Sequence, residues 1–210
     1  MDTLHRVAGR DAPPAAPVAG AGLDNPRDIR LDIRLDMPAG EAPDDETDLV
    51  EIGDVARSPA RGLMRVLTRI SSVSTTRPME FVDVTDHVAR CIAEAGIVDG
   101  SATVFSRHTT ACIRINEHEP LLLEDMVAQL ERLVPTDAAY RHDDYSVRTV
   151  NLTENERVNG HSHCRSLLLG ASETVPVAGG RLLLGRWQRI FLVELDGPAQ
   201  RQFVVQAMGC

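Results

Sequence analysis

The residues of this chain best suited to chemistry form two polar clusters. The first, His108-Thr109-Thr110, ends an apolar stretch and is followed by Asn116-Glu117. The second contains His142 and, further along, Asn159 and His163. Burying an imidazole or a carboxylate costs free energy unless a partner compensates it, so such groups beside apolar strands indicate a binding site. We expect a site for a metal ion, a phosphate group or both.

Three histidines from separate segments are candidate metal ligands. Neutral imidazole is a common ligand of zinc and related divalent ions, and catalytic zinc sites typically use three protein ligands and one open position. We therefore predict that His108, His142 and His163 bind a divalent metal, either zinc or magnesium. The alternative is that these are ordinary surface or hydrogen-bonded histidines.

Four further residues are candidates for catalysis or substrate binding. Asn159 lies four residues before His163, so on a helix both would share a face and could address one ligand. Glu117 could be a general base or a partner of a histidine, or a surface carboxylate near a helix start. Asp125 fits a polar anchor or an exposed position equally well. The Thr109 hydroxyl could donate to phosphate, or the residue could simply favour a strand.

The elements that would position these residues follow from apolar periodicity and turn residues. We predict strands at 64–75, 101–107, 111–116, 174–177, 181–195 and 202–208, the fifth with a kink near Gly185 and buried on both faces. Helices are predicted at 86–95 with Thr85 as its cap, from Pro120 to about 133, and from an Asn159 cap through 169. The class is α+β, a mostly antiparallel sheet with about three helices.

The first 60 residues differ from the rest. They carry thirteen acidic residues and six arginines, and seven prolines interrupt a run rich in alanine and glycine. This composition predicts a disordered extension over 1–60 and a folded domain over 61–210. Residues 28–36 alternate charged and apolar side chains, which suits either an edge strand or a solvated charge run.

Composition excludes several classes of function. The chain has no lysine, so neither a Schiff base nor a P-loop lysine is available. The net charge of −9 argues against a nucleic-acid partner. Four widely spaced cysteines, the lack of a signal peptide pattern and the lack of a membrane-length apolar run predict a cytoplasmic protein without a membrane partner.

The ordered motifs resemble the YjbQ family over about 63–209. They are His108-Thr109-Thr110, Ile115-Asn116-Glu117, Asp125, Tyr140-Arg141-His142, Asn159-x-x-x-His163, Leu169-Gly170-x-Ser172, Val175-Pro176-Val177, Leu184-Gly185-x-Trp187-Gln188 and Asp196-Gly197-Pro198. His161 departs from the family, where a small or acidic residue is common, and so do Arg186 and the long extension.

The resemblance implies a homotrimeric α+β protein with a metal-supported site and a small phosphorylated substrate. The implied activity is that of a secondary thiamine-phosphate synthase, a transferase that joins hydroxymethylpyrimidine diphosphate to thiazole phosphate and releases diphosphate. By position it implicates His108, Thr109, Glu117, Asp125, His142, Asn159 and His163. Arg107, Arg114 and Arg165 are candidate phosphate partners. Two alternatives are a metal-dependent hydrolase of a phosphorylated molecule, and a trimeric metal- or metabolite-binding protein without enzymatic activity.

Overall fold

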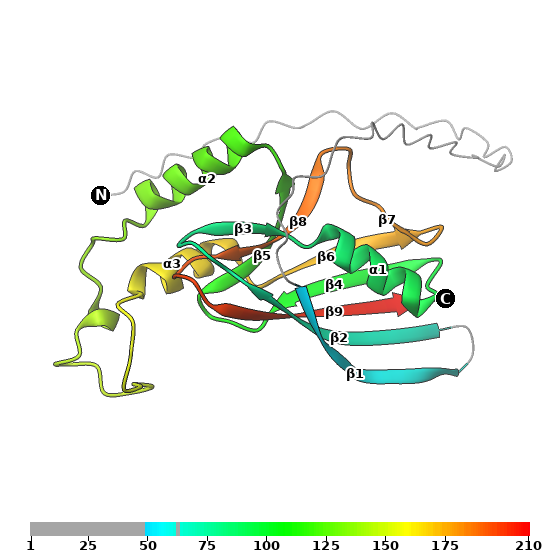
Figure 1. The fold of residues 1–210 in the computed structure, drawn as a ribbon, viewed down its shortest axis with the longest axis horizontal. Coiled ribbons are helices and arrows are strands. Elements are labelled where there is room, and N and C mark those ends of the chain that lie inside the picture. Colours follow the sequence, from blue (N-terminus) through cyan, green and yellow to red (C-terminus); the bar gives the residue numbers. More distant parts are fainter. Residues whose placement is uncertain (1–48, 62–63) are drawn as a thin grey trace, which may run out of the picture. The chain divides into compact units, whose positions relative to one another are not determined.

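The computed structural model describes residues 49–61 and 64–210, with side chains described from residue 64 onward (Figure 1). These residues form two antiparallel sheets and three α-helices, which confirms the α+β class. The strands are β1 (Leu49–Arg61), β2 (Met64–Ser74), β3 (Glu80–Asp83), β4 (Gly100–Ser106), β5 (Ala111–Glu117), β6 (Ser172–Ala178), β7 (Arg181–Leu182), β8 (Gln188–Glu194) and β9 (Gln200–Gly209). The helices are α1 (Thr85–Ala95), α2 (Pro120–Leu133), α3 (Gly160–Leu169) and the short 3₁₀ helix η1 (Arg141–Asp143).

The larger sheet has the strand order β1-β2-β9-β4-β6-β7, and the smaller one β3-β8-β5. Alternation of apolar and polar side chains explains the larger sheet: on β9, Phe203, Val205 and Ala207 are buried while the residues between them are less so. Helix α1 contacts β2, β9, β4 and β7 and so covers one face of this sheet (Figure 1). Its apolar face includes the buried Val88 and Ile92.

Strand β8 is buried on both faces, as its continuous apolar sequence predicts. Ile190 and Leu192 belong to the core beneath α1, whereas Phe191 and Val193 belong to a second core. That second core also contains Leu130 of α2. Each such side chain stabilises the fold by roughly 1.5–3 kcal/mol relative to an exposed position. Strand β8 therefore lies between the two cores.

Several sequence predictions need correction. The expected strand 181–195 is two strands in different sheets, because residues 183–187 leave the larger sheet before β8 begins. Strand β3 was not predicted. Thr85 does not cap α1, since its hydroxyl accepts a hydrogen bond from the backbone N–H of Ile190 at 2.7 Å.

Strand β1 lies within the segment predicted to be a disordered extension, so ordered structure begins before residue 61. Its register against β2 shifts at three places, which breaks the strict alternation by which a strand is recognised. Pro59 is compatible with its position because β1 is an edge strand. The rest of the predicted extension, including the alternating run 28–36, lies outside the described residues. Among those described, no helix is long and apolar enough to cross a membrane.

Candidate functional site

The predicted histidines meet where α3 begins, beside the connection between β4 and β5. The Ser162 hydroxyl donates to the backbone carbonyl of Leu195 at 2.6 Å, and the N–H of Leu195 donates to the carbonyl of Thr110 at 3.1 Å. These bonds attach the first turn of α3 to the end of β8 and to the loop that carries His108. The sequence places the residues far apart, and the packing of α3 joins them.

His142 and His163 are in direct contact. Their ring centroids lie 4.6 Å apart with an interplanar angle of 60°. The Nε2 atom of His142 is buried and has no hydrogen-bond partner among the described residues. Burial lowers the pKa of His163, and the neighbouring His142 and Arg148 lower it further. These effects favour the neutral form of His163, in which one ring nitrogen is free to accept a hydrogen bond or bind a metal.

His108 and His163 line one pocket of about 600 Å³, here called the histidine pocket. Its lining is Phe105, Ser106, Arg107, His108, Thr109, His163, Ser166, Leu167 and Ala171. Burial lowers the pKa of His108, and the nearby Arg201 guanidinium lowers it further. The volume is in the range of small-molecule sites. Three distant histidines thus converge on one region, His142 through its contact with His163.

Asn159 does not line the histidine pocket, and its side chain does not act as the predicted cap. Its side chain makes no capping bond; instead the Asp143 carboxylate accepts the backbone N–H groups of Asn159 and Gly160 at 3.0 and 2.9 Å. The Asn159 amide donates to Asp196 at 3.3 Å, and its own Oδ1 is buried without a partner among the described residues. An unsatisfied buried acceptor costs about 1–3 kcal/mol, which makes Asn159 a candidate for contact with a ligand.

A buried ion pair lies next to this region and was not predicted. Arg201 donates to both carboxylate oxygens of Glu194 at 2.5 Å, and Glu194 has no exposed surface. Burial would raise the pKa of Glu194, but hydrogen bonds from Arg201, the Asp196 N–H and the Thr75 hydroxyl together hold it below its ordinary value. A carboxylate inside the apolar run of β8 was the available sequence signal, because such a charge needs a partner.

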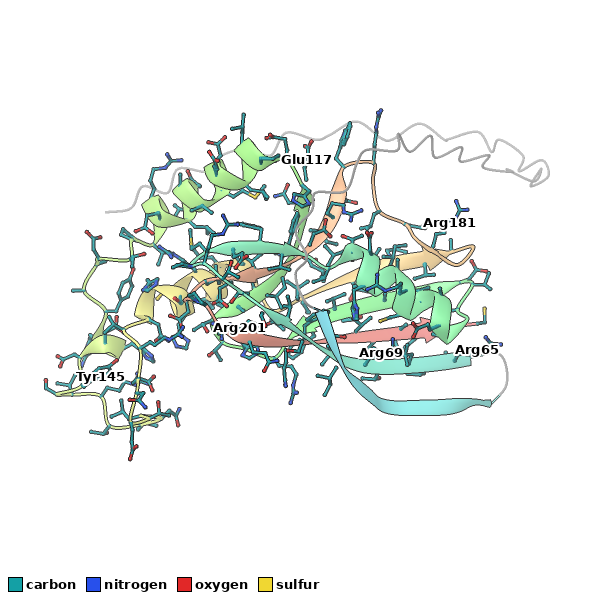
Figure 2. All side chains as sticks on the ribbon, in the orientation of Figure 1. Arg65, Arg69, Glu117, Tyr145, Arg181 and Arg201 are labelled. Carbon is teal, nitrogen blue, oxygen red and sulfur yellow. The ribbon has the colours of Figure 1, made fainter. Side chains whose placement is uncertain are left out.

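The two predicted carboxylates are not brought to the histidines within one chain. Glu117 ends β5, whereas His108 precedes its start, and seven residues of strand span roughly 20 Å. Figure 2 shows Glu117 where β5 leads into α2, and Arg201 at the start of β9. Asp125 is exposed on α2 and does not line the histidine pocket.

Two of the three candidate phosphate-binding arginines are paired with carboxylates. Arg114 pairs with Glu173 at 2.5 Å, and the buried Arg165 bonds to Glu131 and to the carbonyl of Val134. Arg107 lines the histidine pocket, where its guanidinium donates to the Gln202 side chain at 2.6 Å.

Metal binding stays a prediction. Among residues 64–210, no group of three or more His, Cys, Asp or Glu side chains is placed to hold a metal ion. His142 and His163 are close enough to supply two ligands, and the unpartnered Nε2 of His142 suits that role. The residues present therefore fit a metal held by two histidines, with the remaining ligands from substrate, water or another chain.

Comparison with known proteins places the chain in a family. A family model described as "UPF0047 protein YjbQ-like" matches residues 69–210. The chain belongs to this family. A UPF0047 protein of Methanothermobacter thermautotrophicus is 43% identical over 146 residues, covering 70% of this chain and 94% of the relative. The UPF0047 protein YugU of Bacillus subtilis is 35% identical over 138 residues, covering 65% and 96%.

Solved structures of YjbQ-like proteins share the fold. A YbjQ-like protein of unknown function from Sulfolobus solfataricus superposes with a TM-score of 0.63 at 36% identity, covering 70% of this chain and 99% of the other. An uncharacterized protein of the YjbQ/UPF0047 family from Clostridium acetobutylicum gives a TM-score of 0.58 at 33% identity, covering 66% and 98%. The likeness covers the site, because the matched region of the family model contains all the predicted site residues.

Proposed function

We propose that this YjbQ-like protein is a transferase with thiamine-phosphate synthase activity. It would join hydroxymethylpyrimidine diphosphate to thiazole phosphate at the histidine pocket. The observation that supports the proposal is the shared lining of that pocket by His108, Thr109 and His163, with His142 against His163. Their hydroxyl and imidazole groups can donate hydrogen bonds to phosphoryl oxygens, and the imidazoles can also bind a metal ion.

The reaction needs stabilisation of a leaving group more than proton transfer. The thiazole nitrogen forms a bond to the pyrimidine methylene carbon, and the bond from that carbon to the diphosphate oxygen breaks. The diphosphate leaves with the electron pair, so charge grows on its oxygens, and donors fixed around those oxygens lower the barrier. The Thr109 hydroxyl, His163 and Arg107 line the pocket in positions suited to this role.

A bound divalent metal would supply further charge neutralisation for the diphosphate. His142 and His163 would hold it, because their rings are in contact and His163 lines the histidine pocket. The alternative hydrolase needs a general base such as Glu117, which one chain does not bring to the pocket.

We also propose that the protein is a homotrimer. Large apolar side chains are exposed on the single chain, notably Leu167 at 84% and Leu121 at 68%. Exposed apolar surface of this kind is typical of interaction sites. Leu167 lines the histidine pocket, so a neighbouring chain would cover surface next to the site. Glu117 and Asp125 could then reach the pocket from that neighbour.

Rescue of a thiamine auxotroph that lacks its own thiamine-phosphate synthase tests the activity. We expect wild-type protein to restore growth and His163→Ala to abolish it. Alanine favours the helix, so α3 should remain folded. The matched control is His118→Gln, because His118 lies outside the histidine pocket and pairs with Asp83 at 3.1 Å.

Three measurements accompany the rescue experiment. Circular dichroism must show that both variants are folded, and elemental analysis of purified protein reports the metal. Formation of thiamine phosphate from the two substrates is then measured in vitro. Tight binding of either substrate without turnover would instead favour the binding-protein alternative, and wild type that neither rescues nor turns over refutes the transferase.

A further inference from the structure

The imidazole of His108 is held in one tautomer by the backbone of β9. The N–H of Gln202 donates to His108 Nε2 at 2.7 Å. A backbone amide nitrogen can only donate, so Nε2 must be the unprotonated nitrogen of the ring. In the neutral ring the proton then lies on Nδ1. The tautomer follows from this hydrogen bond alone.

The loop that carries His108 is held on both sides. The Gln202 side chain accepts from the Arg107 guanidinium at 2.6 Å, and the Gln202 carbonyl accepts from the Arg107 N–H at 3.2 Å. The Ser106 hydroxyl donates to the Ala111 carbonyl at 2.7 Å and accepts from the His108 N–H at 3.3 Å. The ring is thus oriented by fixed backbone rather than by a mobile side chain.

This arrangement disagrees with the prediction that His108 is a metal ligand. Its Nε2 lone pair is already used by Gln202, and ligation through Nδ1 would require that nitrogen to lose its proton. His142 and His163 carry no such restraint among the described residues, and His142 Nε2 is unpartnered. His142 therefore has a ring nitrogen available for a metal, whereas the Nε2 of His108 is already used as an acceptor.

We propose that His108 is a neutral hydrogen-bond donor, through Nδ1–H, to a phosphoryl oxygen of the substrate. Thr109 supplies a hydroxyl on the same pocket lining, and any metal belongs to His142 and His163. The proposal rests on the proposed function in one respect, namely that the substrate is phosphorylated. A neutral donor of this kind binds an anion without changing the charge of the protein.

Nuclear magnetic resonance tests the tautomer directly. Long-range ¹H–¹⁵N correlation spectra of protein with ¹⁵N-labelled histidine distinguish protonated from unprotonated ring nitrogens. The signals of His108 are assigned by their loss in His108→Asn. We expect the proton on Nδ1 near neutral pH. A proton on Nε2 would overturn the proposal.

Two variants separate the donor from a metal ligand. The amide of His108→Asn reaches the position of Nδ1, whereas the amide of His108→Gln reaches that of Nε2. The affinity for inorganic phosphate is measured by calorimetry on the native assembly. We expect the affinity of the His108→Asn variant to stay within a few-fold of wild type. The Gln variant should bind roughly ten- to a hundredfold more weakly, as for a lost hydrogen bond to a charged group.

The outcomes also distinguish this proposal from the proposed function. Phosphate binding that depends on His108 in this way, without any thiamine-phosphate synthesis, supports the donor and refutes the transferase. Thiamine-phosphate synthesis by wild type, with equal phosphate affinity in both variants, supports the transferase and refutes the donor role of His108. Loss of bound zinc in both variants, measured by elemental analysis, would make His108 a metal ligand and overturn the donor role.

Discussion

The substitution Arg201→Met should strongly destabilise the fold. It removes the partner that donates twice to Glu194 at 2.5 Å, while the carboxylate stays fully buried. Leaving one member of a buried ion pair without its partner costs about 3–5 kcal/mol. Three donors remain on Glu194, from the Thr75 hydroxyl and the N–H groups of Leu195 and Asp196, so the lower end of that range is expected.

Urea unfolding followed by circular dichroism measures this cost. Chain concentration must be equal for all variants, because the stability of an oligomer depends on it. The control is the double variant Arg201→Met with Glu194→Gln, which removes the buried charge but keeps an acceptor for the N–H groups. We expect it to recover part of the lost free energy of unfolding.

The pH dependence gives the reasoning a second test. In wild type the pKa of Glu194 is below its ordinary value of 4.5, so its stabilising contribution is present above that pH and is lost as pH falls through the folded-state value. Without Arg201, burial dominates and raises the pKa, so the penalty of the single variant should shrink as the pH is lowered. An Arg201→Met protein within about 1 kcal/mol of wild type at neutral pH would refute the argument.

Two further predictions concern assembly and histidine titration. If Glu117 acts from a neighbouring chain, the variants His163→Ala and Glu117→Gln should each be inactive alone. Refolding a mixture of the two should restore part of the activity in mixed trimers, measured as thiamine-phosphate formation. No recovery would exclude a shared site. Burial, with a smaller contribution from Arg165, lowers the pKa of His161 below 6.5, so the unfolded chain binds more protons and the stability of metal-free protein should fall as the pH is lowered through 6.5. The urea midpoint, measured below and above pH 6.5, should change less with pH in His161→Gln than in wild type. An equal dependence of the midpoint on pH in both proteins would contradict the assignment to His161.

Local patterns predicted most of the elements. The helix from Pro120 begins at the predicted proline, and the helix ending before Gly170 stops at the predicted glycine, because the preferences of these two residues are local. The division of 181–195 into β7 and β8 was not predictable, because both pieces have strand-like composition and only their partners differ. The same holds for β1, whose bulges break its pattern.

The candidate site was predicted in part. Residue types alone selected His108, His142 and His163 as a group, and the structure brings them to one region. They could not show that Gln202 would occupy one nitrogen of His108, since that bond joins residues 94 positions apart. The strand predicted at 111–116 already separates Glu117 from His108, but residue types could not show where Glu117 lies relative to His142 and His163.

The sequence by itself determined the α+β class, the family and the set of polar residues available for chemistry. Each follows from periodicity or from the order of motifs, which are properties of short stretches. Only the tertiary structure decided which of those residues share a pocket, which arginine compensates Glu194 and which nitrogen of His108 accepts from the Gln202 backbone. These depend on strand pairing between distant segments, and such pairing is set by the packing of the whole sheet rather than by any single stretch.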